Sequence, residues 1–439
     1  MNESTRSTLQ TIGAALIVGA ITGATWFAIN TPSERPAVAA APTPAEPAGE
    51  PIARSGDIAA LMAVKGAPVE GLPPLSADEV RVCGQTLPRA ALVEDKIERT
   101  LHEAGAAAAL NAFAQQHLTD DDHARAVGLV LRMQADANYR DAPDSQSACK
   151  TDECWKQQTR AHAERVAPLL TELATLAATS TDPRVMMLAR DQCFVLSVDA
   201  APLPHCQALT ARRLVALDRD NAVAWLALAA EEPASIDEAM YQASLARRWD
   251  DYAMASRRFI ERVDAKGGLR SMVVVQSLLA VPALRSIEGQ RLVTQHCDVK
   301  PVAADANRHQ LCEKVAEVLH ERSTSVTGLV TAGVVAKTLG SAEAAAWQEQ
   351  AALLNHVLLT QSLDEAAQIR DAQDCTFGMS RELLLRSARE GEVPALRALM
   401  QASGQSEAQW RENMIAFAQA QAAGQITTTA SAAAASAPR

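Results

Sequence analysis

Apolar residues recur with helical spacing along most of the chain. Between positions 92 and 101, Leu92, Val93, Ile97 and Leu101 share one helix face, and the charged residues between them lie mostly off it. The strict apolar–polar alternation of a β-strand is almost absent. The pattern therefore predicts an all-α fold of about 16 to 18 helices, stacked as helical hairpins.

Helix starts are marked by polar residues that precede acidic residues or proline. A hydroxyl or carboxylate at the N-cap accepts a hydrogen bond from a free backbone N–H of the first turn, and proline fits the first helical position. We therefore expect helices to begin after Ser76, Thr119, Thr181, Ser235 and Ser341.

Residues 11–29 form an uncharged apolar stretch. About 19 residues make roughly 28 Å of helix, which approaches the thickness of the hydrocarbon core of a membrane. Trp26 and Phe27 suit the membrane interface. A cleaved signal peptide is the alternative, with a candidate site at residues 37–39, but that site lies about ten residues beyond the apolar stretch. We favour a retained single N-terminal transmembrane helix.

The remaining composition divides the chain into segments. Residues 30–55 are rich in Pro and Ala and lack apolar periodicity, so they predict an extended linker. The predicted segments are a cytoplasmic N-terminus at 1–10, the anchor at 11–29, the linker at 30–55, an all-helical domain at 56–423 with a subdivision near 265, and a disordered tail at 424–439.

Two further apolar stretches resemble membrane spans. Residues 272–284 and 326–336 are strongly apolar and uncharged. Both are shorter than the roughly 17 residues that a span requires. They predict buried helices of a soluble core.

Cysteine spacing indicates the compartment. The chain has eight cysteines, and six of them form close pairs in sequence. Close pairs behind an export segment predict disulfides in an oxidising compartment, although eight cysteines allow about 105 connectivities. We predict a single-pass protein of the bacterial inner membrane with most of its chain in the periplasm. The pairs are Cys149 with Cys154, Cys193 with Cys206 and Cys297 with Cys312, and the remaining two cysteines are Cys83 and Cys375.

Composition and charge exclude one class of partner. The net charge is −11, whereas affinity for nucleic acid depends on Lys and Arg that neutralise phosphates. Nucleic acid is therefore not an expected partner. Abundant alanine favours helix, because Ala has the highest intrinsic helix propensity.

Residues 217–229, with the sequence LDRDNAVAWLALA, resemble the junction of two tetratricopeptide repeats. Trp225, Leu228 and Ala229 match the aromatic, leucine and small positions of that family, and small residues recur through position 246. Arg219 stands where the family has a turn proline, and the second helix starts about two residues early. The resemblance implies a helical-hairpin solenoid that binds protein partners, with Trp225 filling the space between paired helices.

Candidate chemistry is sparse. No nucleophile elbow, H-E-x-x-H motif, Walker loop or dinucleotide glycine pattern occurs, so no cofactor is expected. His296, Cys297, His309 and Cys312 have the residue types of a tetrahedral zinc site. A Cys297–Cys312 disulfide explains the same residues more simply in an exported chain.

The function predicted from these observations is a membrane-tethered periplasmic scaffold or adaptor that acts by contact with protein partners, and the sequence leaves catalytic activity open. The alternative is a cell-wall or small-molecule hydrolase built on a helical superstructure. A pocket that clusters two carboxylates favours the hydrolase. Free thiols or bound zinc favour a redox or metal-carrying module.

Self-association through the membrane helix is testable. Ala15, Gly19 and Gly23 stand four residues apart, and a face of small residues lets two membrane helices pack closely as a homodimer. Replacing Gly19 and Gly23 by Leu should therefore abolish dimerisation in a membrane reporter assay. Unchanged association of the double variant excludes this face.

Overall fold

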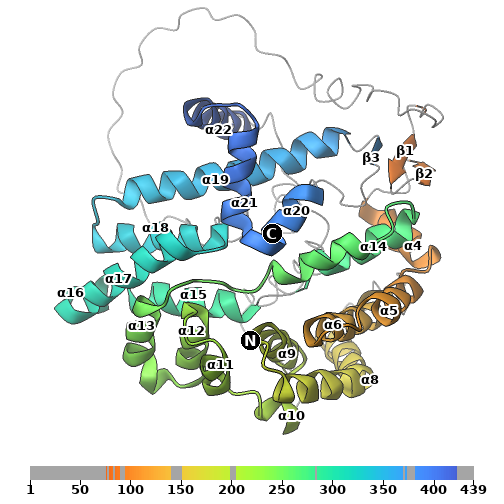
Figure 1. The fold of residues 1–439 in the computed structure, drawn as a ribbon, viewed down its shortest axis with the longest axis horizontal. Coiled ribbons are helices and arrows are strands. Elements are labelled where there is room, and N and C mark those ends of the chain that lie inside the picture. The colour runs from red at the N-terminus through yellow and green to blue at the C-terminus, as the bar shows by residue number, and fades with distance from the viewer. Residues whose placement is uncertain are drawn as a thin grey trace, which may run out of the picture.

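The computed structural model describes residues 76, 79–82, 85–88, 94–139, 151–197, 204–281, 284–368, 371–372 and 381–422. This part of the chain is mostly helical (Figure 1). The predicted anchor at 11–29 with Ala15, Gly19 and Gly23, the linker at 30–55 and the tail at 424–439 lie outside it. Among the helices that are described, none is long and apolar enough to cross a membrane.

The first helices pack as consecutive neighbours on one side of the molecule. Helix α5 lies against α6, α6 against α8, and α8 against α9 (Figure 1). Their bounds are α4 (Glu94–Glu103), α5 (Ala106–His117), α6 (Asp122–Tyr139), α8 (Asp152–Thr179), α9 (Pro183–Ser197) and α10 (Pro204–Gln207).

The chain then forms a second series of packed helices and returns to the first. Helix α17 packs on α18 and α18 on α19, whereas α14 leaves this series and packs on α5 and α6. The series comprises α11 (Ala211–Leu217), α12 (Ala222–Glu231), η2 (Pro233–Ser235), α13 (Ile236–Leu245), η3 (Ala255–Arg262), α14 (Gly268–Leu279), α15 (Leu284–His296), α16 (Val299–Ala303), α17 (Ala306–Arg322), α18 (Val326–Leu339), α19 (Ala344–Gln368), α20 (Arg381–Glu390), α21 (Glu392–Ala402) and α22 (Glu407–Ala422).

The described residues of the two apolar stretches, 272–281 and 326–336, are mostly buried, as predicted for core helices. Met272 and Val273 of α14 and Leu329 of α18 are fully buried. Residues on both sides of position 265 share the main apolar cluster, and a second, smaller cluster joins α18, α19, α20, α21 and α22. Burial of these faces supplies the main driving force for folding.

A small sheet corrects the expectation of an entirely helical body. Strands β1 (Glu79–Val82) and β2 (Gln85–Pro88) form an antiparallel hairpin, and β3 (Asp371–Ala372) pairs in parallel with β1. Ser76 was expected to start a helix. Its backbone N–H and its hydroxyl instead donate to Oε2 of Glu79 at 3.0 and 2.7 Å, and a strand follows. Pairing with β3 is a long-range interaction, so local spacing gives no sign of it.

Two predicted helix starts shift by one or two residues. Helix α6 is capped by Asp121 rather than Thr119, because Oδ1 of Asp121 accepts from the Ala124 N–H at 2.6 Å. Before α9, Oδ1 of Asp182 accepts from the Arg184 N–H at 2.9 Å, and Pro183 occupies the first helical position. In both cases a carboxylate provides the cap in place of the predicted threonine.

The segment with the tetratricopeptide-like sequence forms α11, α12 and α13. Leu228 and Ala229 are buried in α12. Trp225 is partly buried, packs against the main apolar cluster, and donates from Nε1–H to the carbonyl of Arg219 at 2.8 Å. The indole therefore also secures the turn between α11 and α12.

Residues 247–252 form an extended segment, named here the central strap. It runs between the loops that precede the N-termini of two helices. The Arg247 and Arg248 N–H groups both donate to the carbonyl of Asp220, at 3.0 and 3.1 Å. On its other side, Trp249 N–H donates to the Arg322 carbonyl at 3.1 Å, and Thr324 N–H donates to the Trp249 carbonyl at 3.0 Å. The strap thus joins the loop before α12 to the loop before α18.

The ladder continues to the start of α21. The Val393 N–H donates to the Thr324 carbonyl at 3.1 Å. In return, the Glu392 carboxylate accepts from the Val326 N–H at 3.0 Å. Glu392 is buried, and its charge lies at the N-terminus of α18, where the helix dipole favours an anion. Three helix starts are therefore connected through one irregular ladder.

Asn221 is the central polar side chain of this ladder. It is fully buried, and its Oδ1 accepts from the N–H groups of Val223 and Asp250 at 3.2 and 3.0 Å. Its Nδ2 donates to the Asp250 carbonyl at 2.7 Å and to the Asp218 carboxylate at 3.2 Å. Both donors and both acceptor positions of the amide are used, so the side chain is fully satisfied.

Replacing Asn221 by Ala should therefore lower the free energy of unfolding by about 3 to 5 kcal/mol, since it leaves several buried groups without partners. Equilibrium denaturant unfolding measures the change. Asn111 is the control, because its Nδ2 makes one local bond to the Ala107 carbonyl at 2.8 Å. Asn111→Ala should cost no more than about 1 kcal/mol. Equal losses in the two variants contradict a central role for Asn221.

Candidate functional site

The structure confirms two of the predicted cysteine pairs. Cys193 is bonded to Cys206, and Cys297 is bonded to Cys312. Cys154 is also disulfide-bonded. Cys83, Cys149 and Cys375 lie outside the described residues.

The Cys297–Cys312 disulfide uses both sulfurs of the alternative zinc site. Because Cys297 and Cys312 are bonded to each other, neither offers a thiolate to a metal. His296 Nε2 lies 3.3 Å from Asp237 Oδ1, and His309 Nδ1 lies 3.6 Å from Glu313 Oε1. Within the described part of the chain, no group of three or more His, Cys, Asp or Glu residues is arranged to hold a metal ion.

The strongest candidate for a site is a cavity beside the central strap. It is surrounded by residues from α6, α9, the strap, η3 and the segment just after α14. Its volume, taken as the space open to the centre of a water-sized sphere, is about 10 Å³. A polar cavity of this size holds about one water molecule. Its lining comprises His123, Arg184, Met187, Leu188, Asp191, Asp251, Tyr252, Ser256 and Val281.

His123 contributes a buried imidazole. Its exposed fraction is 2%, and its Nδ1 has no hydrogen-bond partner within the protein. Burial, together with the positive charges of Arg184 and Arg258, lowers the pKa of His123 to about 3. The imidazole is therefore neutral at physiological pH and packs against the Phe259 ring, with centroids 5.4 Å apart.

Asp251 contributes a buried carboxyl with the opposite shift. Burial raises its pKa to about 6, although the Ala253 N–H donates to its Oδ1 at 3.1 Å. The negative charges of Asp250 and Glu392 raise the pKa further. Burial lowers the pKa of the neighbouring Arg257, which interacts with both Asp251 and Glu392.

Tyr252 has an unusual backbone conformation. Its φ is 60°, and no other non-glycine residue in the described part of the chain has a positive φ. The side chain of Asp250 stabilises the turn by accepting from the Tyr252 N–H at 2.9 Å, and the Tyr252 hydroxyl donates to the Asp218 carboxylate. Left-handed backbone in a bulky residue is strained and persists only where its surroundings impose it.

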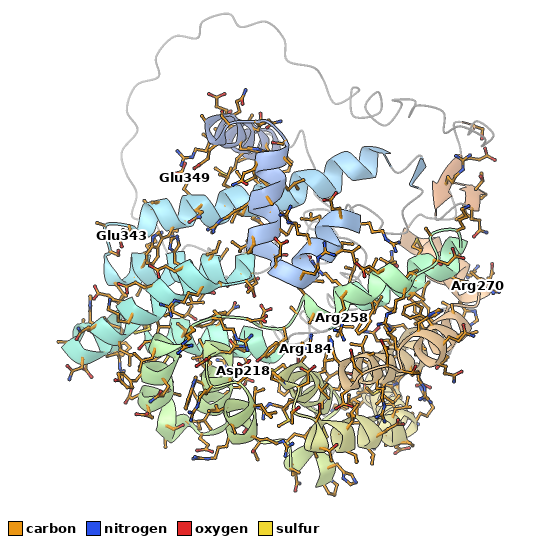
Figure 2. The ribbon with its side chains drawn as sticks, in the orientation of Figure 1. Arg184, Asp218, Arg258, Arg270, Glu343 and Glu349 are labelled. Atoms are coloured by element: carbon orange, nitrogen blue, oxygen red, sulfur yellow. A yellow bond between two sulfur atoms is a disulfide. The ribbon has the colours of Figure 1, made fainter. Side chains whose placement is uncertain are left out.

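Ion pairs surround the cavity. Arg184 pairs with Asp182 at 2.6 Å, and Arg258 pairs with Asp121 at 2.8 Å. Figure 2 shows Arg184, Asp218 and Arg258 near one another in the middle of the molecule. The positive charges of Arg184 and Arg258 neutralise the carboxylates of Asp182 and Asp121 with which they pair.

This arrangement can position one small polar molecule between a neutral imidazole and a carboxyl that titrates near pH 6. Environments that push two pKa values apart are typical of acid–base sites. The cavity, however, has no room for a sugar ring or a peptide. Its geometry therefore favours a structural role.

No sequence pattern indicates this cavity. His123 and Asp251 lie about 130 positions apart and share no motif, so only the fold brings them to one cavity.

A second hollow lies at the surface beside the sheet. It occupies about 340 Å³ and is lined by Gln85, Ala104, Gly267, Leu269 and Arg270. Arg270, labelled in Figure 2, donates from Nε to the Ala104 carbonyl at 3.1 Å, and Gln85 Oε1 accepts from the Leu269 N–H at 3.2 Å. These contacts join the hairpin and the turn between α4 and α5 to the start of α14.

The two pKa shifts predict opposite effects of pH on stability. The pKa of Asp251 is raised from its unfolded value of 3.8 to about 6 in the folded protein. Its contribution to stability, on the order of 2–3 kcal/mol, is therefore fully present below pH 4 and is lost as pH rises through 6. The pKa of His123 is lowered from its unfolded value of 6.5 to about 3 in the folded protein. Its contribution to stability is therefore present above pH 6.5 and is lost as pH falls toward 3.

Asp251→Asn should therefore gain stability relative to the parent protein as pH rises from 4.5 to 7. His123→Asn should lose stability relative to the parent over the same range. Denaturant unfolding at four pH values measures both differences. A constant offset for either variant, independent of pH, contradicts the assigned shift.

No protein-family model, curated protein or solved structure gives a significant match to this chain. Its function is therefore inferred from its own residues.

Proposed function

We propose that the chain is a periplasmic scaffold, held at the inner membrane by residues 11–29, that acts through contact with a protein partner. The helical body is its working part, and the tetratricopeptide-like segment at 217–246 suggests a solenoid-type architecture. The observation that carries the proposal is an apolar pair on the outer face of α13.

The disulfides support the proposed compartment. Cys193–Cys206 and Cys297–Cys312 each close a short loop, with sequence separations of 13 and 15 residues. Disulfides persist in oxidising compartments and are rare where cytosolic thiols are kept reduced. They therefore agree with export of the helical body.

The outer face of α13 supports contact with a protein. Tyr241 and Leu245 are one turn apart and are 51% and 58% exposed, whereas Met240 and Ala243 on the opposite face are fully buried. Residues at i and i+4 are neighbours on a helix surface, so the two apolar side chains form one patch. Tyrosine is enriched at protein interfaces because it offers a large apolar area and a hydroxyl.

A charged group beside the patch indicates the chemistry of the partner. Glu238 is exposed one turn before Tyr241 and on the same stripe of α13. An apolar patch with a carboxylate at one end complements a partner surface that has apolar residues beside a Lys or Arg. We therefore propose a protein partner with a basic, apolar surface.

A hydrolase is the second candidate, and one observation favours it. Asp191 and Asp251 both line the central cavity, which is the clustering of carboxylates expected for such an enzyme. The volume of about 10 Å³ admits water but no substrate of that class. The scaffold is therefore the preferred function.

Replacement of Tyr241 and Leu245 by Ser should test the scaffold. Loss of two apolar contacts should weaken partner binding by at least about tenfold, because each buried apolar side chain contributes roughly 1.5–3 kcal/mol. In-cell photocrosslinking from Gln242, followed by mass spectrometry, identifies the crosslinked partner and measures its yield.

Val299 and Ile415 provide a matched control. They are 58% and 53% exposed and lie on other helices, α16 and α22. Replacing both by Ser should leave the crosslinked product unchanged. If the α13 variant retains the same product at the same yield, the patch is not the contact surface and the proposal fails.

A further inference from the structure

We propose that the Cys193–Cys206 disulfide is a site of thiol–disulfide exchange with a dithiol reductant, whereas the Cys297–Cys312 disulfide is permanent. The two bonds have the same covalent chemistry and differ in their surroundings. This inference goes beyond the scaffold function and does not depend on the identity of its partner.

The two disulfides differ in burial. Cys297 and Cys312 are both 0% exposed and belong to the main apolar cluster. Cys193 and Cys206 are only partly buried and pack at the edge of that cluster. An attacking thiolate must reach a sulfur along the S–S axis, so access controls the rate of exchange.

Loop length does not explain the difference. The loops span 13 and 15 residues, so the entropy model assigns each bond about the same stabilisation, near ~3 kcal/mol. The buried bond therefore serves as an internal control for the exposed one.

Exposed residues adjoin both cysteines of the Cys193–Cys206 bond. Cys206 lies in α10, a helix of four residues, none of which is buried. Next to Cys193, the side chains of Phe194 and Val195 are 38% and 40% exposed. Exposed apolar residues beside a disulfide give an incoming oxidoreductase a surface to contact.

The exchange is balanced as a two-electron transfer. One thiolate of the dithiol attacks a sulfur of the Cys193–Cys206 bond, and the other cysteine leaves as a thiolate and takes up a proton. The second thiol of the reductant, once deprotonated, then attacks the mixed disulfide. The protein gains two electrons and two protons and ends with two thiols, and the reductant ends as a disulfide.

Contacts beyond the disulfide should keep the body folded after reduction. The buried Arg190 donates from Nη1 to the Leu209 carbonyl at 2.6 Å and pairs with Glu231 at 2.7 Å. Glu231 also accepts from the Ala211 N–H at 2.7 Å, which caps the start of α11. Reduction should therefore loosen α10 and leave α11 and α12 in place.

Treatment of the full chain with dithiothreitol under native conditions tests the proposal. Thiols are alkylated at intervals and located by peptide mass spectrometry. Cys193 and Cys206 should become alkylated at least about 100-fold faster than Cys297 and Cys312. Similar rates for the two pairs, or reaction of Cys193 and Cys206 only in denaturant, overturn the proposal.

Hydrogen exchange after selective reduction provides the second measurement. Amides at 204–210 should exchange faster, and amides at 211–231 should keep their protection. Loss of protection across 211–231 shows a bond that the body needs for folding, which also overturns the proposal. The Cys193→Ser/Cys206→Ser variant should reproduce the pattern of the reduced protein without dithiothreitol.

Discussion

The side-chain amide of Asn221 holds together the place where the central strap meets the starts of two helices. Its four hydrogen bonds reach Val223 in α12, both backbone groups of Asp250 and the carboxylate of Asp218. These groups are buried, so each would carry a desolvation cost without its partner. The ladder to Thr324 and Val393 depends on the strap being fixed in this position.

The fixed strap also explains the charges beside the cavity. Tyr252 adopts its strained conformation because Asp250 and Asp218 hold both ends of the residue. That turn places Asp251 in the interior, where burial raises its pKa, opposite the neutral His123. The polar interior is thus occupied by groups that hold loops together, and the exposed patch on α13 is the surface that we propose for a partner.

Helical spacing, buried apolar helices and two disulfides were predictable because each depends on residues that are close in sequence. Leu329, for example, belongs to a short uncharged run, and Cys297 and Cys312 are 15 residues apart. The β1–β3 pairing and the meeting of His123 with Asp251 at the cavity were not predictable, because contact between distant segments decides them. The hydrogen bond from the Trp225 indole N–H to the Arg219 carbonyl was likewise not predictable, because it depends on the shape of the turn between α11 and α12.

The ladder from Asn221 to Val393 has a consequence for how such a chain can evolve. In an open array of hairpins each unit contacts only its neighbours, so units are added or lost without harm to the rest. Here the starts of α12, α18 and α21 share hydrogen bonds across about 170 residues of sequence. Duplication or deletion of one hairpin between them would shift the register of the others. The number of helices in this body is therefore constrained by its centre.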